Sequence, residues 1–136
     1  MPASCEVTLT IPFHDLDPLH VVWHGNYYKY FDIARFELFR SCGVDLYGYS
    51  REAGFLFPLT RSSAKYIAPL RHNDVITCRA TVTEVQYKIA MAFEIRRAAD
   101  DLLCARGASD QVAVTLPDME LQFEIPAAIQ RALGGA

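Results

Sequence analysis

Residues 26–42 hold more apolar and aromatic side chains than one face of a helix can accommodate, and this stretch constrains the fold most strongly. Ten of its seventeen residues are apolar or aromatic. Phe31, Ala34 and Leu38 recur at helical spacing, but they form only part of a wide apolar surface. The pattern predicts a long helix that is packed on more than one side, so another element has to wrap around it.

Residues that favour helix ends mark the limits of this helix and predict a second, shorter one. Asn26 is a residue type that often caps a helix N-terminus, and Gly43 suits the left-handed position that follows a C-terminus. A second helix is expected over residues 45–53, from Asp45 to Ala53, and Gly54 would end it.

The rest of the chain reads mainly as strands with period-two alternation. In the first of them, Val7, Leu9 and Ile11 fall on one side and mostly polar residues on the other. The connections between the four later strands are short, which favours antiparallel pairing of successive strands. Five strands are expected, over residues 5–13, 56–67, 74–85, 88–98 and 102–115, with Pro117 ending the last; a terminal helix is expected from Pro126 through Leu133.

This order of elements predicts an α+β fold in which a curled five-stranded antiparallel sheet wraps around one long central helix. The short C-terminal helix is an addition to that core. A sheet curled in this way leaves two edges and one face uncovered. We therefore expect an assembly of copies rather than a free monomer.

Size and composition argue for one globular domain and against several functional classes. At 136 residues the chain is expected to form a single domain, 1–136. A net charge of −3 argues against a nucleic-acid partner, and no apolar run is long enough to span a membrane. The first six residues lack signal-peptide features and the four cysteines are widely spaced, so we expect a cytoplasmic protein with reduced thiols.

The candidate chemistry is concentrated in a short window just ahead of the long helix. Residues 14–24 contain two carboxylates and three of the chain's four histidines. A helix N-terminus offers free backbone N–H groups and a dipole that favours negative charge. A carboxylate beside such a ready-made oxyanion site is the layout needed to hydrolyse an acyl bond without a metal.

The window and the start of the helix together resemble the signature of a known family. The motif reads Asp15-x-Asp17-Pro18-x-x-Val21-Val22-x-His24-Gly25-Asn26-Tyr27-x-x-Tyr30-Phe31-x-x-Ala34-Arg35-x-Glu37. It is similar to that of the 4-hydroxybenzoyl-CoA thioesterase-like acyl thioesterases, including the YbgC-type branch, and the order of elements resembles their hotdog fold. The resemblance covers nearly the whole chain. Leu19 and His20 stand where the family often has small residues, and their bulk is expected to narrow or reshape the acyl pocket.

The resemblance implies roles for individual residues of the window. Asp17 matches the catalytic carboxylate, which either attacks the thioester carbonyl or activates a water molecule as general base. Backbone N–H groups near His24 and Gly25 would stabilise the oxyanion. The candidate catalytic residues are Asp17, His24 and Gly25, and the candidate substrate-binding residues are Pro18, His20, Asn26 and Tyr27. Asp15 is expected to be structural, bonded to the backbone of its own loop.

The resemblance also implies a substrate and an assembly. The substrate would be an acyl thioester of CoA or of an acyl carrier protein; its CoA or phosphopantetheine is part of the substrate, so no separate cofactor and no metal are expected. The assembly would be a homodimer joined edge to edge, or a homotetramer, with Arg35 and Glu37 in ion pairs at a subunit contact. The residues that could hold CoA phosphates or an acidic carrier protein are Arg61, Lys65, Arg71, Arg79, Lys88, Arg96 and Arg97.

Three alternative functions stay open. A non-catalytic acyl-binding protein of the same fold would keep Asp17 and differ only in an assay. A hotdog dehydratase would need an H-x-x-x-G-x-x-x-x-P pattern, which His24 and Gly25 do not fit. A metal-dependent hydrolase would draw its ligands from the histidines and carboxylates of residues 14–24, and metal analysis of the purified protein would decide that reading.

Overall fold

The computed structural model describes residues 2–134, and its elements largely follow the expected order. In this part of the chain no helix is both long and apolar enough to cross a bilayer. The elements are β1 (Ser4–Thr10), the 3₁₀ turn η1 (Phe13–Asp15), α1 (Asn26–Ser41), α2 (Leu46–Ala53), β2 (Phe55–Leu56), β3 (Leu59–Tyr66), β4 (Val75–Glu84), β5 (Ile89–Arg97), β6 (Leu102–Gln111), β7 (Val114–Thr115), β8 (Glu120–Leu121) and α3 (Ala127–Leu133).

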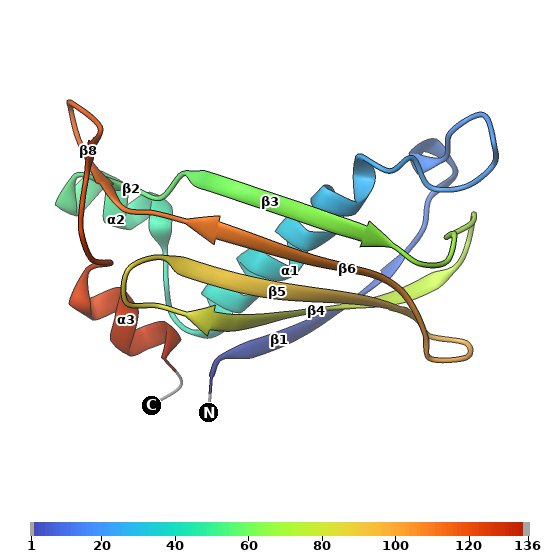
Figure 1. Cartoon of the computed structure of the whole chain (residues 1–136). Helices are drawn as coiled ribbons and strands as arrows, with labels where there is room; N and C mark the ends of the chain where they lie inside the picture. Colours follow the sequence, from blue (N-terminus) through green and yellow to red (C-terminus); the bar gives the residue numbers. More distant parts are fainter. Residues whose placement is uncertain (1, 135–136) are drawn as a thin grey trace.

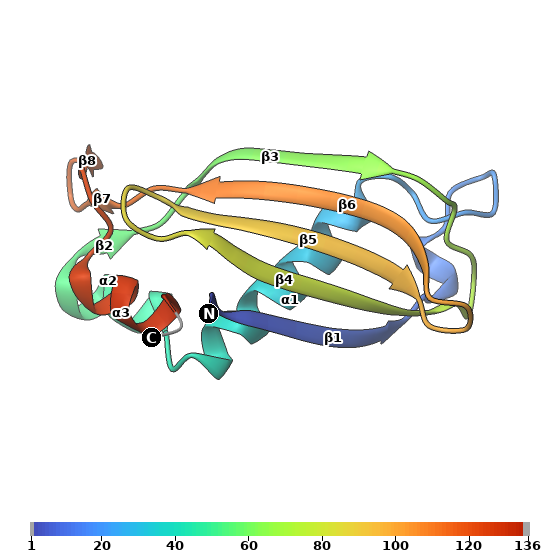
Figure 2. The same ribbon diagram turned by 60° about the horizontal axis from the view of Figure 1, so that its bottom comes forward.

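Five antiparallel strands form one curved sheet in the order β1-β4-β5-β6-β3, and α1 lies against one of its faces (Figures 1 and 2). This confirms the expected α+β arrangement. The expectation that this helix is packed on more than one side is not met. Its buried residues recur at the spacing of one helical face, whereas Phe36 is 62% exposed, so the helix buries one side only. Its buried residues are Tyr27, Tyr30, Phe31, Ala34, Arg35, Leu38 and Phe39.

The closest approach between α1 and the sheet occurs at Gly107 of β6. The Phe31 ring stacks on Phe93 of β5 at 4.8 Å between ring centroids. A Cβ atom added to Gly107 would lie 2.4 Å from the Phe31 ring and 3.0 Å from the Ser63 carbonyl oxygen. The absence of a side chain at residue 107 therefore lets the helix settle onto the sheet.

Several strand limits differ from the predicted ones, and proline accounts for two of the differences. The first strand ends at Thr10 rather than residue 13, since Pro12 has no N–H for the ladder, and Phe13 lies exposed in η1. Pro58 separates β2 from β3, so the expected strand 56–67 is two strands. The expected strand 102–115 is likewise divided into β6 and β7. With β8, which was not predicted, the short pieces β2 and β7 form a second sheet in the order β2-β7-β8.

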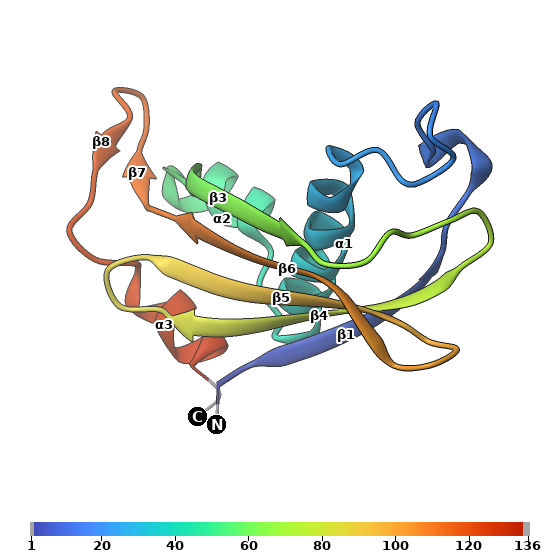
Figure 3. The same cartoon turned by 45° about the vertical axis from the view of Figure 1, so that its right-hand side comes forward.

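The pairing of β3 also differs from the prediction. A short connection between β3 and β4 was expected to make them neighbours, but β3 pairs with β6 at one edge of the sheet. The chain after β3 therefore crosses one end of the sheet, where it meets the loop that precedes α1 (Figure 3). The Val22 N–H donates to the Leu70 carbonyl at 2.8 Å and joins the two segments. This crossing builds one wall of the site described below.

The helix ends fit their predicted signals with one exception. Asp45 caps α2 by accepting a hydrogen bond from the Gly48 N–H at 3.0 Å, and Gly54 ends that helix at φ +73°. Gly43 adopts φ +73° after α1, as predicted. Asn26 does not cap α1, because Gly25 occupies the N-cap position and Asn26 is the first helical residue.

We predict that Gly107→Ala destabilises the fold by about 1–3 kcal/mol, the usual cost of overpacking a core. The Phe31 ring cannot retreat because it is stacked on Phe93. Urea denaturation would measure the free energy of unfolding. Ala108→Ser, on an exposed neighbouring residue, is the control and should change stability by less than about 0.5 kcal/mol. Equal stability of the Gly107→Ala protein and the wild type would contradict this packing account.

Candidate active site

The loop between η1 and α1 is folded back on itself and holds Asp17 at a fixed place. Leu16 and Val22 form an isolated antiparallel bridge. The Asp17 N–H donates to the Val21 carbonyl at 2.8 Å, and the His20 N–H donates to the Asp17 carbonyl at 2.9 Å. His20 turns the chain at φ +65°. These bonds fix the backbone of Asp17 on both sides.

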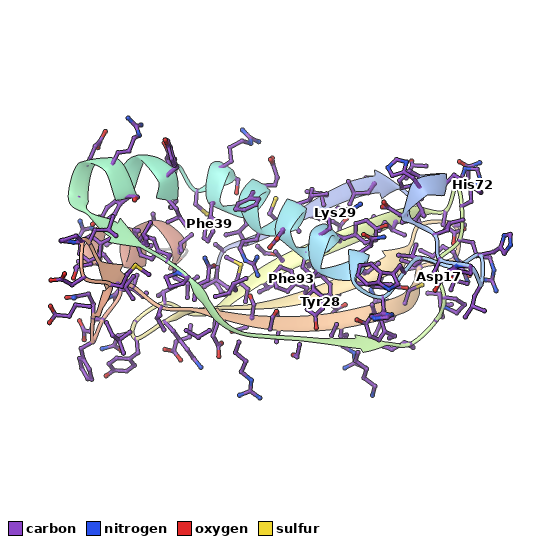
Figure 4. The ribbon with its side chains drawn as sticks, turned by 90° about the horizontal axis from the view of Figure 1, so that it is seen from above. Asp17, Tyr28, Lys29, Phe39, His72 and Phe93 are labelled. Carbon is purple, nitrogen blue, oxygen red and sulfur yellow. The ribbon has the colours of Figure 1, made fainter. Side chains whose placement is uncertain are left out.

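The Asp17 carboxylate has one oxygen engaged and one oxygen free. Oδ1 accepts a hydrogen bond from the Leu19 N–H at 2.8 Å, which orients the side chain. Among the described residues no group donates to Oδ2. Figure 4 shows Asp17 beyond the N-terminal end of α1, with Phe39 at the opposite end of that helix. The free oxygen is available to a water molecule or a substrate carbonyl.

The start of α1 leaves two backbone N–H groups free. The Asn26 N–H donates to the Trp23 carbonyl at 2.9 Å and the Tyr27 N–H to the His24 carbonyl at 3.4 Å. The N–H groups of His24 and Gly25 donate to no acceptor within residues 2–134. They lie where the helix dipole is positive, so the pair can receive a developing oxyanion.

The Trp23 indole packs directly over Gly25. A Cβ atom added to Gly25 would lie 2.3 Å from the indole ring. Gly25 has φ −67°, a conformation open to any residue, so the constraint is steric rather than conformational. The absence of a side chain at residue 25 therefore lets the Trp23 indole pack against the start of the helix.

A cavity of about 330 Å³ opens beside Asp17 and the start of α1. Its polar groups come from Asp17, His24, Tyr27 and Tyr66. The Tyr66 hydroxyl donates to the His24 carbonyl at 3.1 Å, and the Tyr27 and Tyr66 rings meet edge to face at 4.9 Å. Burial raises the pKa of Tyr27 to about 12, so its phenol stays neutral at physiological pH. The remaining lining residues are Val21, Val22, Ile67, Ala68 and Pro69.

The structure brings together only some of the candidate site residues. Asp17, His24 and Tyr27 line the cavity, and Gly25 lies next to it in the chain. Pro18 and His20 are exposed and lie outside the lining, as does Leu19, so the bulk expected to reshape the pocket does not enter this cavity. Asn26 also lies outside the lining; its side-chain Nδ2 donates to the Asp15 carbonyl at 2.9 Å.

Tyr66 and the segment 67–69 complete the cavity and were not predicted. They follow β3, about forty residues after the Asp17 loop. Their place depends on the pairing of β3 with β6, which no local pattern in the sequence indicates. The one available signal is Pro69, which marks the end of the strand.

Asp15 is structural in a different way from the one predicted. It does not bond its own loop through its side chain. Its carboxylate is buried and accepts hydrogen bonds from Lys29 Nζ and the Tyr30 hydroxyl, both at 2.7 Å. Burial alone would raise the pKa of Asp15, but the Lys29 and Tyr30 hydrogen bonds and the Lys29 charge outweigh it and lower the pKa. Asp15 therefore stays ionised.

The other charged candidates pair within the chain. Arg35 is buried, bonds Asp32, and donates from Nη2 to the Ser109 hydroxyl at 2.7 Å. Glu37 pairs with Arg40. Within residues 2–134 no group of three or more His, Cys, Asp or Glu side chains is arranged to hold a metal ion.

Comparison with known proteins identifies the family to which this chain belongs. The model of the thioesterase-like superfamily matches residues 11–133. The chain belongs to this superfamily. It is 32% identical over 75 residues to a putative esterase of Aquifex aeolicus, covering 55% of this chain and 58% of the relative. It is 28% identical over 90 residues to the 4-hydroxybenzoyl-CoA thioesterase of Pseudomonas sp., and that match covers 65% of this chain and 64% of the relative. The matches thus span about 60% of these relatives.

Solved structures confirm the hotdog fold of this superfamily member. The 1,4-dihydroxy-2-naphthoyl-CoA thioesterase Slr0204 from Synechocystis superposes with a TM-score of 0.88 at 21% identity, covering 96% of this chain and 95% of that one. A mutant 4-hydroxybenzoyl-CoA thioesterase complexed with 4-hydroxybenzoyl-CoA superposes with a TM-score of 0.87 at 22% identity, covering 96% of this chain and 99% of that one. The resemblance inferred from the motif is confirmed.

We predict that Gly25→Ala displaces the Trp23 indole. Trp23 is the chain's only tryptophan, so its fluorescence reports this packing alone. The emission maximum should move to longer wavelength and acrylamide quenching should rise, because the ring loses its contact with the helix start. Asp118→Asn, on an exposed residue of the turn before β8, is the control and should leave the emission unchanged. Identical Trp23 emission in the Gly25→Ala protein would contradict the packing.

Proposed function

We propose that this protein is an acyl thioesterase that hydrolyses an acyl-CoA or acyl-carrier-protein thioester to a free acid and a thiol. The observation that carries the proposal is that Asp17 and His24 line one cavity at the N-terminal end of α1, where the N–H groups of His24 and Gly25 have no acceptor among the described residues. Membership in the thioesterase-like superfamily supports it. So do the names of its relatives, which include a thioesterase and a putative esterase.

The proposed chemistry follows from the two oxygens of Asp17. Leu19 holds Oδ1, so Oδ2 is the reacting atom. Oδ2 either attacks the thioester carbonyl, releasing the thiol and leaving an anhydride that water hydrolyses, or removes a proton from the attacking water. In both routes one water is consumed and the carbonyl oxygen becomes negative. The N–H groups of His24 and Gly25 receive that charge.

We propose contacts for the CoA phosphates from the basic residues that are not already paired with a carboxylate. Arg79, Lys88, Arg96 and Arg97 each pair with a carboxylate of the same chain. Arg61, Lys65 and Arg71 make no ion pair among the described residues, and they are exposed. These three remain the proposed phosphate contacts because an unpaired cation loses no intramolecular partner on binding.

We also propose that two copies pair through β3, whose outer edge is open. Leu59 and Tyr66, at the two ends of this strand, are each 46% exposed. A two-fold antiparallel pairing centred on the strand would extend the sheet and set Leu59 of one copy beside Tyr66 of the other. Because Tyr66 lines the cavity, each site would then lie at the subunit boundary.

We predict that Asp17→Asn lowers kcat for thioester hydrolysis by at least about a hundredfold, the scale of losing a positioned acid–base group. The melting temperature should change little, because the side chain accepts only the Leu19 N–H bond. Release of free thiol from a panel of aromatic and aliphatic acyl-CoA and acyl-carrier-protein substrates measures the rate, before and after chelation of metals.

Asp118→Asn, in the distant turn before β8, is the matched control and should keep full activity. Wild-type turnover by a folded Asp17→Asn protein would overturn the catalytic assignment. A wild-type protein that binds acyl-CoA without hydrolysing it would identify an acyl-binding protein instead. Activity that is lost on chelation and restored by one metal would favour a metal-dependent hydrolase.

We predict a homodimer at micromolar concentration that Leu59→Asp dissociates, since a charge would be buried at both ends of the pairing, where Leu59 of one copy lies beside Tyr66 of the other. Sedimentation velocity across a dilution series, paired with activity, measures both effects, and activity should fall with dissociation. Leu121→Asp, on the 66% exposed Leu121 of β8, is the control and should leave the dimer intact. A fully active monomer would remove the shared-site proposal and leave the role of Asp17 standing.

A further inference from the structure

Asp15 lies two residues before Asp17, and its contacts reach the helix that supplies the free N–H groups. We propose that Asp15 is a positioning residue, whose bonds to α1 set the distance between the Asp17 carboxylate and the N–H groups of His24 and Gly25. The proposal rests on the proposed thioesterase function and adds a residue to its machinery. Asp15 does not line the cavity, so it would act through Asp17 rather than on the substrate.

The contacts of Asp15 tie three separate pieces of chain together. Its carboxylate accepts hydrogen bonds from Lys29 and Tyr30 in the first turns of α1, both at 2.7 Å. Its carbonyl oxygen accepts from the Trp23 N–H at 3.0 Å and from Asn26 Nδ2 at 2.9 Å. The start of the Asp17 loop, the end of that loop and the helix are therefore joined at one residue.

The burial of this network argues for geometry rather than for stability as its purpose. Asp15 and Tyr30 are each 3% exposed. The Lys29 side chain is 46% exposed, so its ion pair with Asp15 contributes little net stability. A fully bonded buried carboxylate does, however, allow only one arrangement of its partners. Since both oxygens of Asp15 are bonded to α1, the loop cannot slide along the helix without breaking a buried bond.

The rigid path from Asp15 to the reacting groups is short. The backbone of Asp17 is fixed relative to Asp15 by the Leu16–Val22 bridge and by the hydrogen bond from the Asp17 N–H to the Val21 carbonyl. The hydrogen bond from the Trp23 N–H to the Asp15 carbonyl fixes the next segment, which supplies the His24 and Gly25 N–H groups, relative to Asp15. A displacement of about 1 Å between a catalytic group and its partner can cost about a hundredfold in rate. Release of Asp15 should therefore slow the chemical step.

The test compares Asp15→Asn and Tyr30→Phe with the wild type. For Asp15→Asn we expect kcat to fall by about ten- to a hundredfold while KM changes by less than about twofold, because the cavity walls are untouched. Tyr30→Phe removes only one hydroxyl and keeps the ring, so it should fold even if Asp15→Asn does not and should show a smaller loss of kcat. Lys29→Arg, which keeps the cation, should retain most of the activity.

Two further readouts separate positioning from a general loss of stability. The loss of kcat in Asp15→Asn should be largely absent when the same change is added to Asp17→Asn, since Asp15 acts through Asp17. Trp23 emission should also shift, because its N–H is bonded to Asp15. Asp110→Asn, on β6, is the matched control: it removes the ion pair with Lys88 at 3.1 Å and should change neither readout.

The outcomes distinguish this proposal from the function on which it rests. Absence of thioesterase turnover in the wild type would overturn the proposed function, whatever Trp23 reports. With an active wild type, unchanged kcat in a folded Asp15→Asn protein would overturn the positioning role. The positioning role would also be overturned if the double variant Asp15→Asn/Asp17→Asn lost as much kcat as the two single losses multiplied together. That result would show that Asp15 acts independently of Asp17.

Discussion

The packing of α1 into the hollow of the sheet is the contact on which the rest of the molecule depends. The buried residues of the helix recur at the spacing of one helical face, and this apolar face lies against the curved sheet. The stack of Phe31 on Phe93, over the bare backbone of Gly107, sets how close the two can come. That closeness fixes where the helix N-terminus emerges, and the candidate site is built there.

At this end of the molecule, the parts of the site are held by different elements. The folded loop presents Asp17, and the end of β3 supplies Tyr66. At the helix start the N–H groups of His24 and Gly25 have no acceptor within residues 2–134. The Tyr66 hydroxyl holds the His24 carbonyl, and Asp15 holds the loop to α1. A charge-forming reaction profits from groups that are already in place, because little reorganisation is left for the reaction itself.

Local patterns were enough to predict the parts of this protein that depend on local forces. The apolar content of residues 26–42 indicated the central helix, and the window around Asp17 and His24 supplied two residues of the candidate cavity. The effects of Pro12 and Pro58 on the strands were missed, although both residues are visible in the sequence. The pairing of β3 with β6, and with it the place of Tyr66, depends on contacts distant in sequence. The bonds of Asp15 to Lys29 and Tyr30 required the folded loop.

The central claim is that a thioester carbonyl binds between Asp17 and the free N–H groups at the start of α1. A crystal structure of the protein with a non-hydrolysable acyl-CoA analogue, in which a methylene group separates the sulfur from the carbonyl, tests it most directly. The account predicts the analogue's carbonyl oxygen within hydrogen-bond distance of the His24 and Gly25 N–H groups, with Asp17 Oδ2 beside the carbonyl carbon. A carbonyl bound elsewhere, with these N–H groups unused, would contradict it.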